Sequence, residues 1–157
     1  MTMRLMFMIG AMLGASAVYG NDMKDTARKE TLARVVEALE QSRIARIEIL
    51  HMPDELLTRS SVLPEMLDSG YFYKLEVKNV PAVKSSLLKA LQKLNLSSSD
   101  TIPDLRWAIA FYDSENTRIT TIYIDSRGRH GVIDGTNIKM NGSLYSWIND
   151  NWGRGFR

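Results

Sequence analysis

A helical repeat of apolar residues marks the first clearly patterned segment of the chain. The apolar side chains recur at i, i+3, i+4 and i+7, a spacing that gathers them on one face of a helix. They are Leu32, Val35, Val36 and Leu39. Because charged residues fill most of the other positions, the pattern predicts one amphipathic helix over residues 25–41.

Two short segments alternate apolar and polar residues with the period of a β-strand. They are residues 44–50 and residues 71–78. The core face of the second strand is predicted to carry Tyr71, Tyr73, Leu75 and Val77. Because Phe72 adds a ring to the opposite face, one of the two faces must be exposed or unusually covered. Between the strands, residues 54–69 indicate one or two short helices that end at Gly70.

A second helical stripe follows Pro81, a residue type that fits the first turn of a helix. The stripe consists of Val83, Leu87, Leu91 and Leu94. It predicts a helix that ends near Asn95. The polar residues 97–100 then indicate a linker, and residues 100–103 a turn.

The C-terminal third carries the clearest strand pattern. Residues 105–112 form an apolar run typical of a central strand, and residues 118–125 alternate like its neighbour. Short strands are predicted over residues 131–134 and 138–140, joined by Asp134–Gly135, a dipeptide typical of tight hairpins. A last helix is predicted from one apolar face made of Leu144, Trp147 and Ile148.

The order of these elements predicts the fold class. Consecutive strands joined by tight turns are antiparallel. We therefore predict an α+β fold, in which a C-terminal meander forms an antiparallel sheet and the helices pack mainly on one face. The place of the first two strands in the sheet stays open. Length and composition fit a single domain over residues 21–157, since the chain of 157 residues is 45% hydrophobic and 24% charged.

The first twenty residues have the layout of a secretory signal peptide. Arg4 supplies the positive start, an apolar stretch follows, and small residues precede a cleavage point after Ala17 or Gly20. The apolar part, residues 5–18, is shorter than the ~20 residues of a membrane-spanning helix. We expect a periplasmic or secreted protein with no membrane span after signal removal. The alternative is an uncleaved anchor or a buried N-terminal helix.

Composition argues against several classes of function. The chain has no cysteine, so it can form neither a disulfide nor a zinc–thiolate site. Its 20 basic and 18 acidic residues leave a formal charge of +2, which gives no reason to expect nucleic acid as a partner. Because the sequence contains no motif for nucleotides, phosphates or metalloprotease chemistry, we predict no cofactor and no metal.

The two histidines are the candidates for acid–base chemistry. His51 has Asp54 and Glu55 close by in the sequence, an arrangement that a hydrolase could use. The alternative is a loop histidine with solvated neighbours, which the lack of a second histidine at ligand spacing favours. His130 lies at a predicted hairpin turn. Neither histidine is assigned a catalytic role.

Candidate partner-binding residues fall at that hairpin and near the C-terminus. Arg127, Arg129 and His130 place three potential cations together, where they could grip a phosphate, a carboxylate or an acidic partner. The alternative is a polar hairpin tip. The C-terminal candidates are Trp152, Arg154 and Phe156, because Trp and Arg commonly anchor protein interfaces. Their alternative is packing on the sheet or a frayed tail.

These observations favour a small exported binding protein that acts by contact with another protein. An inhibitor or immunity protein that neutralises a toxin or an envelope enzyme fits this description. Two alternatives stay open, namely a small extracytoplasmic hydrolase that uses His51 or His130, and an envelope structural or assembly protein. The sequence determines neither the partner nor the oligomeric state.

Overall fold

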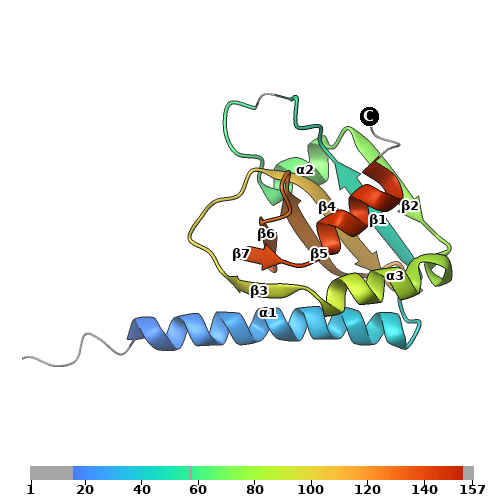
Figure 1. Ribbon diagram of the computed structural model, residues 1–157, viewed down its shortest axis with the longest axis horizontal. Helices are drawn as coiled ribbons and strands as arrows, with labels where there is room; N and C mark the ends of the chain where they lie inside the picture. The colour runs from blue at the N-terminus through green and yellow to red at the C-terminus, as the bar shows by residue number, and fades with distance from the viewer. Residues whose placement is uncertain (1–15, 57, 154–157) are drawn as a thin grey trace, which may run out of the picture.

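Helices and strands contribute comparable shares of the chain in the computed structural model, which describes residues 16–56 and 58–153 (Figure 1). The helices are α1 (Ser16–Glu40), α2 (Pro64–Gly70), α3 (Val80–Gln92) and α4 (Leu144–Ile148), followed by the π-helical turn η1 (Asn149–Gly153). The strands are β1 (Arg46–His51), β2 (Tyr73–Val77), β3 (Asn95–Ser98), β4 (Leu105–Tyr112), β5 (Arg118–Asp125), β6 (His130–Ile133) and β7 (Thr136–Asn141). The predicted α+β class is confirmed.

All seven strands join one antiparallel sheet in the order β2-β1-β4-β5-β6-β7-β3. Strands β4 to β7 form the predicted meander. The predicted hairpin turn between β6 and β7 is also confirmed, because Asp134 and Gly135 both have positive φ, 48° and 70°, as a type I′ turn requires. The first two strands, whose place the sequence left open, extend the sheet beyond β4.

Most helical residues pack on one face of the sheet, as predicted. Helices α1, α3 and α4 cover this first face over a large apolar core whose fully buried side chains include Val35, Leu39, Leu87, Leu91, Ile109, Phe111 and Ile148. Helix α2 and the segment before it cover part of the second face. They pack there on a smaller cluster that includes Leu50, Val62, Leu67, Ala108 and Tyr123. Because α2 is short, it leaves the rest of the second face uncovered, and this part of the face carries polar side chains.

Helix α1 is longer than predicted and is already helical at Ser16, so it runs through both predicted cleavage points. Its packed face agrees with the predicted stripe. Thr31 and Thr120 both donate side-chain hydrogen bonds to the Asp134 carboxylate, which ties α1 to the β6–β7 turn. Helix α1 also contacts β3, and it runs alongside that strand at one end of the sheet (Figure 1).

The predicted linker over residues 97–100 is wrong for residues 97–98, because they belong to the edge strand β3 (Asn95–Ser98), and only residues 99–100 lie outside a strand. Leu96 pairs with Met140 of β7 in this strand. Asparagine and serine have low strand propensity, so only the distant partner strand defines β3. The preceding helix accordingly ends at Gln92, three residues before the predicted end.

Candidate functional site

A polar pocket of about 480 Å³ lies on the open part of the second sheet face. Strands β1, β2, β4 and β5 and helix α2 each contribute to its wall, and Ala110 is the small residue on its sheet side. Its lining consists of Glu48, Leu50, Asp68, Tyr71, Lys74, Ala110, Tyr112 and Arg118. We call this cavity the Glu48 pocket.

Glu48 is the centre of one hydrogen-bond network in the pocket. Its carboxylate accepts hydrogen bonds from Lys74 Nζ at 2.7 Å, from the Tyr112 hydroxyl at 3.1 Å and from the Arg46 guanidinium. The Arg46 guanidinium also lies over the Tyr112 ring, 3.8 Å from its centre. Burial alone would raise the pKa of Glu48, but the hydrogen bonds and the two nearby cations lower it below the usual value of 4.5.

Asp68 is the centre of a second network, which α2 brings to the sheet. Its carboxylate accepts a hydrogen bond from the Tyr123 hydroxyl at 2.9 Å and an ion-paired hydrogen bond from Arg118 Nη1 at 3.3 Å. Burial, together with the Asp68 carboxylate, raises the pKa of Tyr123 to about 12. The Tyr123 phenol of the second network is therefore protonated at neutral pH.

The ionisation of the Glu48 network is fixed in the same way. The hydrogen bond to Glu48 raises the pKa of Lys74, and burial, with the Glu48 carboxylate, raises the pKa of Tyr112. Proton-transfer catalysis needs a group whose pKa lies near the working pH. Glu48 stays ionised and Lys74 and Tyr112 stay protonated at neutral pH, so none of the three groups has its pKa near that pH.

The cations of the pocket are more exposed than the carboxylates that they pair with. The side chain of Lys74 is 38% exposed and that of Glu48 10%, while the side chain of Arg118 is 49% exposed and that of Asp68 31%. The charge that solvent meets first is therefore positive. An anionic group that enters would find charged N–H donors, which form the stronger class of hydrogen bond.

Three consecutive rings lie beside the pocket, where the chain enters β2. Tyr71 lines the pocket, Phe72 is 61% exposed, and Tyr71 and Tyr73 are also exposed. The expectation that one ring-bearing face is exposed is confirmed. The assignment of Tyr71 and Tyr73 to the core is wrong, because Tyr71 precedes β2 and Tyr73 is the first residue of this edge strand, and both are exposed. Leu75 and Val77 do pack against the core.

His51 does not lie in a loop, because it is the last residue of β1 and is buried. Its ring stacks on Trp107, with 3.7 Å between ring centres, and Tyr73 lies on a roughly parallel plane at 6.0 Å. Its Nδ1 lies 3.2 Å from the Arg106 carbonyl oxygen. Burial lowers the pKa of His51 below 6.5. The register that pairs His51 with Trp107 produces this burial, and spacing along the sequence does not reveal it.

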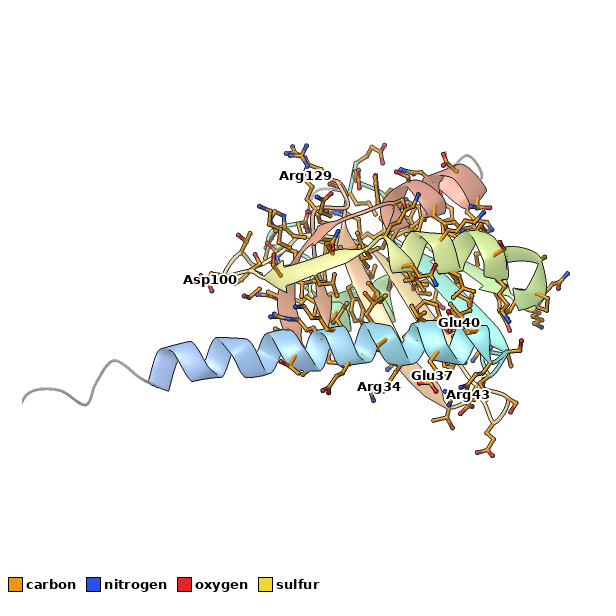
Figure 2. All side chains as sticks on the ribbon, turned by 60° about the horizontal axis from the view of Figure 1, so that its bottom comes forward. Arg34, Glu37, Glu40, Arg43, Asp100 and Arg129 are labelled. Atoms are coloured by element: carbon orange, nitrogen blue, oxygen red, sulfur yellow. The ribbon has the colours of Figure 1, made fainter. Side chains whose placement is uncertain are left out.

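Two of the hairpin candidates, Arg127 and Arg129, lie in the turn between β5 and β6, and the third, His130, is the first residue of β6. Arg127 and Arg129 are exposed, and Arg129 projects from the body of the molecule (Figure 2). The Asp125 carboxylate accepts hydrogen bonds from the backbone N–H groups of Arg127, Arg129 and His130, and lies 3.3 Å from His130 Nδ1. Asp125 therefore pairs with the backbone N–H groups of the turn and with His130, while the Arg127 and Arg129 side chains remain exposed.

The C-terminal candidates are placed only in part. Trp152 is half-buried and packs edge-to-face on Trp147, with 4.6 Å between ring centres. The Trp147 indole N–H in turn donates to the Ser86 hydroxyl of α3 at 2.9 Å. Trp152 thus extends the packing of α4 on the first face. Arg154 and Phe156 lie outside the described residues.

Comparison with protein-family models, with curated proteins and with solved structures finds no match to this chain. Over the described residues, no three side chains of His, Asp or Glu gather closely enough to hold a metal ion. In the same part of the chain, no helix combines the length and the apolar character needed to cross a membrane.

Sequence reasoning missed the Glu48 pocket. The alternation of β1 does place Arg46 and Glu48 together on a polar strand face, which was the one available signal. Asp68 and Arg118 are 50 residues apart and meet only because α2 docks on the second face. Neither residue belongs to a motif, so the pocket depends on contacts between distant segments.

Proposed function

We propose that this chain is an exported binding protein that holds a protein partner, as an inhibitor or immunity protein does. The observation that carries the proposal is the Glu48 pocket, whose charged side chains are already paired and whose cations face solvent. Such a pocket is prearranged for recognition. Prearranged groups lose little freedom on binding, which favours affinity.

The exposed charge of the pocket indicates what it receives. Arg118 and Lys74 supply cationic N–H groups, and Tyr71 supplies a phenol and an apolar ring at the entrance. An aspartate or glutamate side chain of the partner fits these donors. Phe72 and Tyr71 then supply exposed aromatic surface beside the charged contact, and aromatic and arginine anchors of this kind dominate protein interfaces.

The hydrolase alternative has weaker support from the same geometry. The His51 ring is covered by Trp107, and His130 is held at its own turn by Asp125. The Glu48 pocket is lined by neither histidine. We therefore favour binding over hydrolysis as the role of this face.

The proposal is tested by capture from an envelope extract on the immobilised chain. Three variants are compared with the unchanged protein: Arg118→Gln and Tyr71→Ser in the pocket, and Lys89→Gln on the exposed side of α3 as the matched control. We expect a partner at stoichiometric yield with the unchanged protein and the control. We expect the two pocket variants to bind it at least tenfold more weakly, because Arg118→Gln removes a charged donor and Tyr71→Ser removes an aromatic contact.

Two results would contradict the proposal. One is the absence of any stoichiometric partner. The other is a partner that both pocket variants retain as strongly as the control does, which would move the binding surface elsewhere, for example to Arg127 and Arg129.

A further inference from the structure

Strand β2 lies at one end of the sheet, and among the described residues β1 is the one strand paired with it. The Met52 N–H donates to the Arg106 carbonyl at 2.9 Å, which fixes the hydrogen-bond phase of β1 against β4. Backbone groups of a strand point alternately to its two sides. Following this alternation through β1 into β2 leaves the N–H and C=O groups of Lys74 and Glu76 pointing away from the sheet.

The sequence of β2 is complementary to itself when read in opposite directions. It runs Tyr73, Lys74, Leu75, Glu76, Val77. If two copies pair antiparallel about Leu75, Lys74 lies opposite the partner's Glu76, and Glu76 lies opposite the partner's Lys74. Leu75 meets the partner's Leu75 on the other face. Opposite charges directly across a pair of strands stabilise it.

The same charges discriminate against the other pairings. A shift of two residues places Lys74 opposite the partner's Lys74, or Glu76 opposite the partner's Glu76. A parallel arrangement in register also matches like charges. Because like charges across strands destabilise the pair, one antiparallel register is selected. We infer that two copies of this chain associate edge to edge through β2 in that register, extending the sheet across a two-fold axis.

The charges within one copy favour the same partner. Glu48 and Glu76 are directly opposite each other in the β1–β2 register, and Arg46 lies between them, with its Nε 3.8 Å from Glu76. Lys78 Nζ also lies 3.8 Å from the Glu76 carboxylate, and the partner's Lys74 would add a further cation beside it. Lysine on an edge strand ordinarily repels a second edge. Here Lys74 lies opposite the partner's Glu76, so its charge attracts the second copy instead of repelling it.

This inference goes beyond the proposed function. It shares Lys74 with the Glu48 pocket, whereas Arg118 and Tyr71, the residues that test the pocket, take no part in it. Its test is a charge-swap pair, Lys74→Glu and Glu76→Lys, examined by sedimentation velocity on protein purified as the cell processes it. The unchanged protein should dimerise in a concentration-dependent way. Each single variant should dimerise at least tenfold more weakly, because both cross-strand pairs become like-charged. An equimolar mixture of the two variants should recover the dimer, because its pairs are opposite again.

A second measurement does not depend on the folding of the charge variants. The chain has no cysteine, so a Leu75→Cys variant places one thiol on the proposed axis. Residues at such a non-hydrogen-bonded position lie ~4.5 Å apart between Cα atoms, within disulfide reach. We expect rapid disulfide-linked dimers under mild oxidation. Tyr73→Cys, whose partner position is the partner's Val77, is the matched control and should cross-link far more slowly.

Three outcomes would overturn the inference. They are a monomeric unchanged protein at its highest soluble concentration, a mixture of charge variants that stays as monomeric as each variant alone, and equal cross-linking of the two cysteine variants.

Discussion

At the scale of single residues, two buried ionisable groups set the response of the protein to acid. The pKa of His51 is lowered by burial, and the pKa of Glu48 is lowered because its hydrogen bonds and nearby cations outweigh its burial. In both cases the unfolded chain binds protons more tightly than the folded chain does. Folding stability therefore falls as the pH drops from the unfolded pKa of each group toward its lower folded pKa.

The first prediction concerns His51. Its contribution is complete above its unfolded pKa of about 6.5 and is lost as the pH falls below that value. Urea unfolding from about pH 7 downward should show this decline, and a His51→Asn variant should flatten it. A decline in that window that persists in the variant would contradict the assignment. The Glu48 contribution declines only below its usual pKa of 4.5, so the two effects are separable.

The second prediction contrasts two glycines. A Cβ on Gly131 would lie 2.0 Å from the Tyr123 carbonyl oxygen of the adjacent strand, whereas a Cβ on Gly135 would meet nothing within 4 Å. Gly131→Ala must therefore push two strands apart and should cost roughly 3 kcal/mol or more of unfolding free energy. Gly135→Ala is strained only by its positive φ and should cost about 1 kcal/mol. Equal costs in urea unfolding would show that the close approach between β5 and β6 is absent.

At the scale of elements, one buried arginine holds the segment that follows β1. The Arg106 guanidinium donates to the Pro53 and Leu56 carbonyl oxygens, each at 3.1 Å, and to the Asp104 carboxylate at 2.6 Å. Its planar fork serves three acceptors at once, a geometry that lysine cannot reproduce. This segment leads to α2, and α2 carries Asp68 into the Glu48 pocket.

The third prediction follows from that clamp. Arg106→Lys keeps the positive charge and a trypsin cleavage site at residue 106, but it loses most of the N–H donors of the guanidinium. Residues 53–63 should therefore be cleaved several-fold faster by trypsin in limited proteolysis. The variant should also lose roughly 3 kcal/mol of unfolding free energy, because polar groups remain buried without their full set of partners. Arg43→Lys, an exposed arginine elsewhere, is the control and should behave like the unchanged chain.

How well an element could be predicted depended on whether its pattern is local. Strands β4 and β5 have the predicted bounds, because their apolar residues already form the pattern of a buried or half-buried strand. Strand β3 was missed because Asn95, Ser97 and Ser98 form a strand only through their pairing with β7. The pocket was missed for the same physical reason. Glu48 and Arg46 are visible on one strand face, but Asp68 and Arg118 are brought together by the docking of α2.

At the scale of the whole molecule, the described side-chain contacts of α1 tie its C-terminal half to the sheet. Thr31 bonds to Asp134, and Val35 and Leu39 are fully buried in the core. Removal of the first 17 or 20 residues, as the two predicted cleavage points would give, leaves the residues that make these particular contacts in the chain. The helical continuity through Gly20 is therefore compatible with export and processing.

The fourth prediction tests that processing directly. Intact-mass measurement of the exported protein should show a chain that begins at Val18 or Asn21. Its thermal unfolding should match that of the chain that keeps these residues, because the packed face of α1 is unchanged. Recovery of an exported chain that retains Met1, or a large loss of stability on processing, would contradict the proposed signal peptide.

The two ends of the sheet differ, and that difference bears on the proposed association through β2. Helix α1 runs alongside β3 at one end, whereas β2 is open at the other (Figure 1). A molecule with two open ends can grow into a filament, as heterologous contacts do when they fail to close. A molecule with one open edge strand uses that strand in a single symmetric contact, and no further edge remains. Association through β2 would therefore stop at two copies, and concentrated solutions should contain pairs rather than polymers.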